Sequence, residues 1–141
     1  MLVTITLGFL VSASSELDSR YIAANAFDCC SRAVEWATNG ENRNFHIEVK
    51  CPEFIRIWKV SLRGRNETNG QQIFHWTINA SANGRDFVVL YTAPNPTYLG
   101  NSVQQFLIDT PHKYNYYRLE CIEAEEGNPG LSYFQLYVYS D

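Results

Sequence analysis

The sequence predicts an all-β protein, built as a sandwich or a barrel of short strands. About eight runs alternate apolar and polar residues in the manner of half-buried strands. Turn residues such as Gly, Pro and Asn separate these runs, and almost no segment has helical periodicity. Composition supports this fold class, because 45% of the 141 residues are hydrophobic and 14% are aromatic. A chain of this length is expected to form one domain, residues 1–141, with a substantial core.

The clearest strand pair lies between Trp76 and Leu90. Its first half alternates apolar and polar residues, and its second half, from Phe87, consists of strand formers. Asn83 and Gly84 lie between the halves and predict a tight hairpin turn, because both residues tolerate a positive φ. We therefore expect the two halves to be antiparallel neighbours.

The other elements are predicted from the same signals. Pro52 is expected to end the strand that contains Phe45, Ile47 and Val49. The mixed polarity of residues 54–63 indicates a bulge. A short helical turn is expected at 22–27. Besides the central pair, the predicted strands cover residues 1–15, 45–49, 54–63, 103–108, 114–122 and 131–139.

Charge and apolar patterning exclude several functions. The net charge is −4, and the only close basic pair is Arg63 and Arg65, which argues against nucleic-acid binding. No apolar run approaches the ~20 residues of a transmembrane segment. Residues 1–15 lack the basic and apolar regions of a secretory signal, so we expect a cytoplasmic protein or a component of a viral or multiprotein particle, with a cell-surface role as the alternative. Catalytic motifs are absent, which predicts a non-enzymatic protein.

The four cysteines and three tryptophans are interpreted mainly as structural residues. Cys29, Cys30, Cys51 and Cys121 have no zinc-binding spacing. Either they are free and mostly buried, or Cys51 and Cys121 form one bridge. The tryptophans, Trp36, Trp58 and Trp76, all lie in strand-like contexts and are expected in the core.

Segments along nearly the whole chain resemble those of the discoidin domain, also called the coagulation factor V/VIII C-type domain, of the galactose-binding-like superfamily. The resemblance implies an eight-stranded jelly-roll β-sandwich. It also implies a non-catalytic module that binds glycans, lipid head groups or proteins through loops at one end. The segments are Ser12-Ala-Ser-Ser15, Ala24-Asn-Ala-Phe-Asp28, Trp36-Ala-Thr38, Phe45-His-Ile-Glu-Val49, Leu62-Arg-Gly-Arg-Asn66, Trp76-Thr-Ile78 with Ser81-Ala-Asn-Gly-Arg-Asp-Phe87, Tyr116-Tyr-Arg-Leu119 and Phe134-Gln-Leu-Tyr137.

The resemblance also implies a calcium loop at Asp28. In many relatives this loop binds calcium through backbone carbonyls and a Glu near the C-terminus. Here Cys29 and Cys30 follow Asp28, and Gln135 stands where that Glu is common. An amide in place of a carboxylate removes one negative charge from a site that prefers anionic oxygens.

Five residues in predicted loops and strand ends are candidates for sugar binding. Sugar recognition needs planar donors, hydrogen-bonding groups for hydroxyls and an aromatic face. Arg65, with Asn66, would bridge two hydroxyls. Glu35 would orient a hydroxyl, His75 would accept a hydrogen bond, and Tyr98 would supply the aromatic face.

Each of these residues also has a structural interpretation. Arg65 would form a salt bridge to Asp28 or Glu35 that ties loops together. Glu35 would cap its loop, and His75 would be a solvated strand end. Tyr98 would pack inward or form an exposed apolar loop tip.

These observations support two functional hypotheses. The first is a lectin-like module that binds a glycan or glycoprotein with low affinity and depends on multivalency. Under it, Arg65→Ala abolishes sugar binding without changing the melting temperature, whereas a lower melting temperature identifies a structural tie. The second is a structural or adaptor subunit, homo-oligomeric or part of a larger viral or cytoplasmic assembly. The loop donors favour the first hypothesis, and the missing secretion signal and the unpaired cysteines favour the second.

Overall fold

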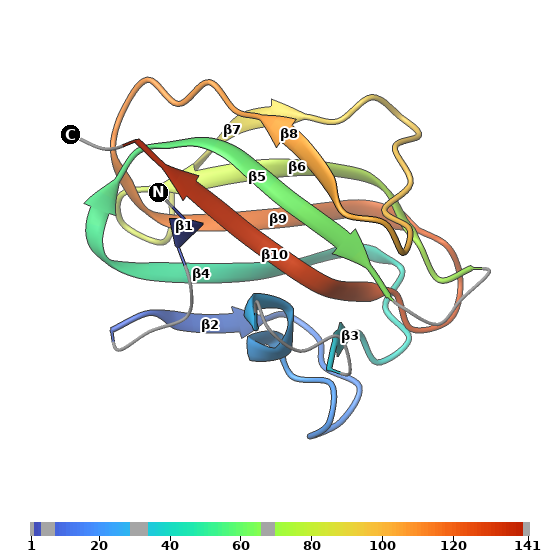
Figure 1. Cartoon of the computed structure of the whole chain (residues 1–141). Coiled ribbons are helices and arrows are strands. Elements are labelled where there is room, and N and C mark those ends of the chain that lie inside the picture. Colours follow the sequence, from blue (N-terminus) through green and yellow to red (C-terminus); the bar gives the residue numbers. More distant parts are fainter. Residues whose placement is uncertain (1, 4–7, 29–33, 66–69, 140–141) are drawn as a thin grey trace.

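The computed structural model describes residues 2–3, 8–28, 34–65 and 70–139, which form a sandwich of two antiparallel sheets (Figure 1). The described part contains ten strands and one short 3-10 helix, η1 (Ala23–Phe27). Two of the strands have only two residues each, so the eight longer ones correspond to the eight predicted runs. The predicted all-β jelly-roll sandwich and the helical turn are confirmed. No helix in the described residues is long and apolar enough to cross a membrane.

In the described part of the chain each sheet has five strands, and Figure 1 shows the sheets as two layers. The first, sheet A, has the order β1 (Leu2–Val3), β10 (Gly130–Val138), β5 (Ile57–Gly64) and β8 (Gln104–Leu107), with β3 (Trp36–Ala37) also pairing with β10. The second, sheet B, has the order β2 (Leu10–Ala13), β4 (Arg43–Ile55), β9 (Tyr114–Ala124), β6 (Ile73–Ser81) and β7 (Phe87–Thr92).

The core lies between the sheets and follows the predicted alternation. Phe45, Ile47 and Val49 of β4 are buried, whereas the residues between them are more accessible. Trp36 and Trp76 are fully buried, as expected. Trp58 is not part of the core, because a bulge in β5 places it on the outer side of sheet A.

The central hairpin forms, but its turn differs from the prediction. β6 and β7 are antiparallel neighbours, with Ser81 paired to Phe87 and a five-residue loop between them. Gly84 has φ +77°, whereas Asn83 is not among the residues with positive φ. Instead, the Asn83 Oδ1 atom accepts hydrogen bonds from the backbone N–H groups of Arg85 and Asp86. This side-chain acceptor organises a wider loop and removes the need for a two-residue turn.

Pro52 does not end its strand. β4 runs through it to Ile55, and the pairing with β9 is irregular between Lys50 and Ile55. A proline has no N–H to donate, so it is tolerated in this unpaired stretch of the strand.

The predicted alternative of a Cys51–Cys121 bridge is wrong. Both thiols are free and buried. Cys121 pairs with Phe45 across the sheet, six residues before Cys51 on β4. At about 3.3 Å per strand residue, the two cysteines are far beyond the ~7 Å that a disulfide permits between Cα atoms. Cys29 and Cys30 lie outside the described residues.

The sandwich has two ends, which are defined here by the residues that lie at each. The loop end is defined here by residues 34–35, 64–65, 71–75, 97–100 and 125–129. The terminal end is defined by residues 56–59, 107–110 and 137–139. Strand β5 runs from the terminal end to the loop end, and the C-terminal end of β10 lies at the terminal end (Figure 1).

Candidate functional site

The fold brings four of the five candidate residues to the loop end. Glu35 precedes β3, Arg65 follows β5, His75 lies near the start of β6, and Tyr98 lies in the loop between β7 and β8. The fifth candidate, Asn66, lies outside the described residues. Sequence reasoning therefore predicted the common location of these residues, although they are up to 63 positions apart, from Glu35 to Tyr98.

Backbone hydrogen bonds tie the loop that carries Tyr98 to both neighbouring strands. The Leu99 N–H donates to the Ile73 carbonyl at 2.8 Å, and the Gly64 N–H donates to the Gly100 carbonyl at 2.7 Å. A Cβ on Gly64 would lie 2.0 Å from the Leu99 oxygen, so only glycine permits this approach. The loop is therefore held in place before any ligand arrives.

Glu35 and Arg65 form a buried ion pair. Arg65 Nε lies 2.8 Å from Glu35 Oε1, and each side chain is only 7% exposed. Arg65 Nη1 also donates to the Asn128 carbonyl at 3.0 Å, and the guanidinium lies 5.2 Å from the centre of the Tyr21 ring. One side chain thus joins three segments that are distant in sequence. Of the two predicted salt-bridge partners of Arg65, Glu35 is the one it contacts, and a direct contact of either residue with sugar stays a prediction.

His75 and Tyr98 are the accessible members of the set. Pairing with β9 shifts on both sides of His75, and Phe74 and His75 are both half-buried between the buried residues Ile73 and Trp76. This bulge places two consecutive side chains on the outer side of sheet B. Tyr98 is 47% exposed, and its ring lies 5.4 Å from that of Phe74. Tyr98 therefore forms an exposed aromatic surface and does not pack inward.

The implied calcium site at Asp28 stays a prediction. Gln135 is fully buried, and its Nε2 donates a long hydrogen bond of 3.4 Å to the Phe27 carbonyl. The Oε1 atom of the same amide is buried and has no hydrogen-bond partner among the described residues. Among the described residues, no group of three or more His, Cys, Asp and Glu side chains is placed to hold a metal ion. Residues 29–33, which the calcium prediction also involves, lie outside the described part of the chain.

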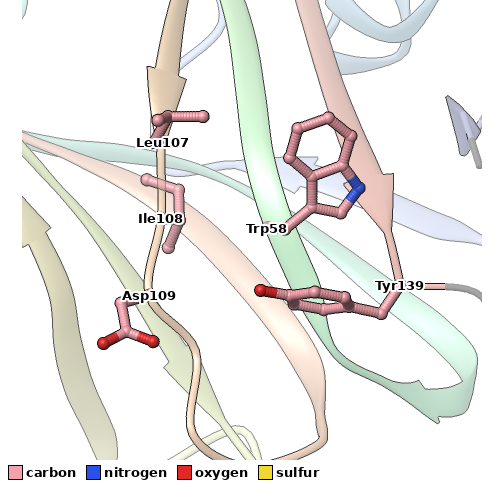
Figure 2. Close-up of a pocket in the computed structure, with 5 residues that line it drawn as sticks. All are labelled: Trp58, Leu107, Ile108, Asp109 and Tyr139. Atoms are coloured by element: carbon pink, nitrogen blue, oxygen red, sulfur yellow. The ribbon is translucent and has the colours of Figure 1, made fainter.

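A cleft at the terminal end was not predicted. It has a volume of about 330 Å³ and is lined by Trp58, Tyr139 and the segment from Leu107 to Asp109 (Figure 2). The mixed polarity of residues 54–63 was the available signal, because it indicated the bulge that places Trp58 there. The other walls of the cleft come from residues about 50 and 80 positions further along the chain than Trp58, and no local sequence pattern connects them with it.

The comparisons with known proteins agree with this architecture. The model of the F5/8 type C domain matches residues 11–136, whereas no curated protein matches the chain. The Clostridium perfringens module CpGH89CBM32-5, in complex with GalNAc-β-1,3-galactose, has 16% identity and a TM-score of 0.79, with 92% of this chain and 95% of that chain covered. The family 32 carbohydrate-binding module of C. perfringens NanJ, in complex with galactose, has 19% identity and a TM-score of 0.77, covering 92% and 93%.

A third similar structure is chitosan-binding module 2 from a chitosanase/glucanase of Paenibacillus sp. IK-5, in complex with chitotriose. It has 14% identity and a TM-score of 0.75, with 93% of this chain and 97% of that chain covered. These structures are similar to the chain in fold, and the family match spans most of its length. The chain belongs to the F5/8 type C, or discoidin, domain family.

Proposed function

We propose that this chain is a non-catalytic carbohydrate-binding module that binds a glycan at its loop end. The observation that carries the proposal is the exposed Tyr98 ring, which lies beside Phe74 on a loop fixed to both β5 and β6. Three structures of the same fold were determined with a sugar bound: GalNAc-β-1,3-galactose, galactose and chitotriose. This similarity supports a sugar as the ligand class.

The five candidate residues divide into contact and positioning roles. Tyr98 presents its ring to the C–H face of a sugar, and His75, whose imidazole has no hydrogen-bond partner among the described residues, bonds a hydroxyl. Asn66 follows Arg65 directly in sequence and adds an amide. The buried pair of Glu35 and Arg65 positions the loops that carry these groups. Few polar contacts on a shallow surface give low affinity per site, so useful binding depends on multivalency.

A second candidate function is a role as a structural or adaptor subunit that binds other proteins. Strand β7 lies at the edge of sheet B, and its Val88 and Val89 are exposed. An exposed apolar edge strand is a template for pairing with another chain. Self-association in light scattering would support this role, and a monomer at high concentration would argue against homo-oligomerisation.

A multivalent glycan array tests the carbohydrate proposal directly. The protein is displayed on streptavidin or beads and probed, with and without a calcium chelator, on galactose, GalNAc-β-1,3-galactose and chitotriose. We expect Tyr98→Ala and His75→Ala to weaken binding at least tenfold while the melting temperature stays unchanged. Phe54→Ala is the matched control, because Phe54 is a similarly exposed aromatic residue outside the loop end. A blank array at high valency, or full binding by both variants, would overturn the proposal.

A further inference from the structure

The cleft at the terminal end is built before any ligand arrives. Backbone hydrogen bonds hold both walls of the cleft to the start of β5 and to Arg56, the residue before this strand. The Ile108 N–H donates to the Trp58 carbonyl at 3.0 Å, and the Tyr139 N–H donates to the Arg56 carbonyl at 2.9 Å. Arg56 Nε also donates to the Thr110 carbonyl at 2.8 Å. The walls therefore have a fixed separation, and a ligand would find a largely preformed site.

A β-bulge places Trp58 in this cleft. Tyr137 of β10 pairs with Lys59, and the next residue, Val138, pairs with Ile57, so Trp58 is an extra residue in β5. Ile57 and Val60 are fully buried, whereas Trp58 and Lys59 between them are only partly buried. Bulges redirect side chains in this way, and here one redirects a large aromatic ring away from the core. Leu107, on the opposite wall, is 74% exposed.

Three polar side chains line the cleft and have no hydrogen-bond partner among the described residues. Trp58 Nε1, the Tyr139 hydroxyl and the Asp109 carboxylate make no hydrogen bond with any described residue. The indole groups of the other tryptophans are both satisfied, since Trp36 donates to the Ser15 carbonyl and Trp76 to the Thr97 carbonyl. In Figure 2 the Tyr139 hydroxyl points from one wall towards the segment that carries Ile108 and Asp109.

The charges around the cleft argue against an ionic ligand. The Arg56 guanidinium lies 4.2 Å from the centre of the Tyr139 ring, and Lys59 Nζ lies 4.8 Å from the centre of the Trp58 ring. Each aromatic ring thus already has a cation on one face, and both cations would repel a cationic ligand. The Asp109 carboxylate on the rim offsets one of the two positive charges, so the attraction of the cleft for an anion is weak. A neutral ligand with an apolar face and several hydroxyl groups matches this arrangement.

We propose that this cleft binds a pyranose ring of a neutral glycan, at a second site separate from the loop end. The apolar C–H face of the ring packs on Trp58 and Leu107. The Tyr139 hydroxyl donates to, and the Asp109 carboxylate accepts from, hydroxyl groups of the sugar. The two sites lie at opposite ends of the sandwich, so one chain would crosslink two glycans or hold two parts of a longer one.

The three indole N–H groups provide a site-specific test. In a ¹⁵N-labelled chain, the indole signal of Trp58 reports on the cleft. That of Trp76 reports on the loop end, because its indole donates to the carbonyl of Thr97, next to Tyr98. Galactose and GalNAc-β-1,3-galactose are titrated to tens of millimolar, which covers weak single-site affinities. We expect a saturable shift of the Trp58 signal, assigned by its loss in Trp58→Phe.

Variants separate the cleft from the loop end. Asp109→Ala and Tyr139→Phe are expected to weaken the titration of the Trp58 signal at least fivefold and to leave that of Trp76 unchanged. Tyr98→Ala is expected to weaken the titration of the Trp76 signal and to leave that of the Trp58 signal unchanged. Phe54→Ala is expected to change neither titration. Because Asp109 and the Tyr139 hydroxyl have no partner among the described residues, these substitutions are not expected to unfold the chain.

Each outcome bears on the two proposals separately. A Trp58 shift without a Trp76 shift supports the cleft and overturns the loop-end site. A Trp76 shift alone supports the loop end and overturns the cleft. Shifts of neither signal at saturating sugar overturn both. A Trp58 shift that survives in both Asp109→Ala and Tyr139→Phe would also contradict the proposed mode of binding.

Discussion

The two ends of the sandwich use the same local feature with different results. At the terminal end, the bulge in β5 places Trp58 and Lys59 on the outer side of sheet A. At the loop end, the bulge in β6 places Phe74 and His75 on the outer side of sheet B. Each pair consists of an aromatic residue followed by a basic one, between two buried apolar residues.

The surroundings of the two bulges differ. At the loop end, a buried ion pair between Glu35 and Arg65 and several backbone hydrogen bonds hold loops beside the bulge. At the terminal end, backbone hydrogen bonds build the walls, and the polar side chains of the cleft have no partner among the described residues. A bulge therefore places side chains on the outer side of its sheet. The segments around the bulge decide whether nearby polar groups stabilise the fold or are available to a ligand.

The largest expected effect is on the buried ion pair. Glu35→Ala leaves the Arg65 charge buried without its carboxylate partner, and we expect the free energy of unfolding to fall by about 3–5 kcal/mol. Chemical denaturation measures this change. The control is Glu123→Ala, which removes the carboxylate from an exposed pair with Arg43 and is expected to lower the unfolding free energy by less than about 1 kcal/mol. Equal losses in the two variants would contradict a structural role for the Glu35–Arg65 pair.

A smaller effect is expected from a methyl group at Gly64. In Gly64→Ala the new Cβ would meet the Leu99 carbonyl oxygen, so the loop that carries Tyr98 must move. We expect a loss of about 1–3 kcal/mol in unfolding free energy, as for other overpacked sites, together with weaker sugar binding at the loop end.

The matched control for this substitution is Gly100→Ala. Its nearest contact is Gln72 Nε2 at 3.3 Å, at the end of a flexible side chain that can move. The Trp58 indole signal should be the same in both variants, because neither glycine is near the terminal end. A changed Trp58 signal in Gly64→Ala would show that the two ends are coupled.

The smallest effect at neutral pH is expected at the cysteines. Burial raises the pKa of the Cys51 and Cys121 thiols to about 12 from an ordinary value of 9.0. The unfolded chain therefore loses these protons at lower pH than the folded chain does. The stability from the two neutral thiols is complete below pH 9 and is lost as the pH rises from 9 towards 12. Chemical denaturation at pH 8 and at pH 10 measures this change. The free energy of unfolding should fall more between the two pH values for the wild type than for Cys51→Ala or Cys121→Ala.

The rates at which the same two thiols react also show how readily each end of the sandwich opens. Cys121 pairs with Trp76 on one side and Phe45 on the other, and the Phe45 ring contacts Trp36, next to Glu35. Cys51 lies near the other end of β4, towards the terminal end. We expect Glu35→Ala to speed the reaction of Cys121 with a thiol reagent more than that of Cys51. The experiment uses a chain with Cys29→Ala and Cys30→Ala. Equal acceleration at both thiols would mean that the ion pair stabilises the whole sandwich and not one end.

Most of the fold was predictable because strand patterning is local. The alternation of Phe45, Ile47 and Val49 predicted both the strand and the face that is buried. Predictions failed where a distant partner or a side-chain acceptor replaced the expected backbone geometry. Asn83 organises a wider loop with its own side chain, and Pro52 occupies an unpaired stretch within β4.

The candidate site was predictable in location but not in roles. Residue type and loop position were enough to select Glu35, Arg65, His75 and Tyr98, and the fold brings them to one end. Which of them is buried depends on the loops that cover them. Arg65 had two sequence-compatible carboxylate partners, and the fold decides between Asp28 and Glu35.

By itself, the sequence determined the strands, their buried faces and the family of the domain, because a period of two residues and short motifs act over a few positions. The tertiary structure decided the register between distant strands, the burial of the Glu35–Arg65 pair and the existence of the Trp58 cleft. These properties depend on atoms from segments tens of residues apart, such as Trp58, Asp109 and Tyr139. Their side chains meet only after the sheets have paired, and no local pattern along the chain records which of them will meet.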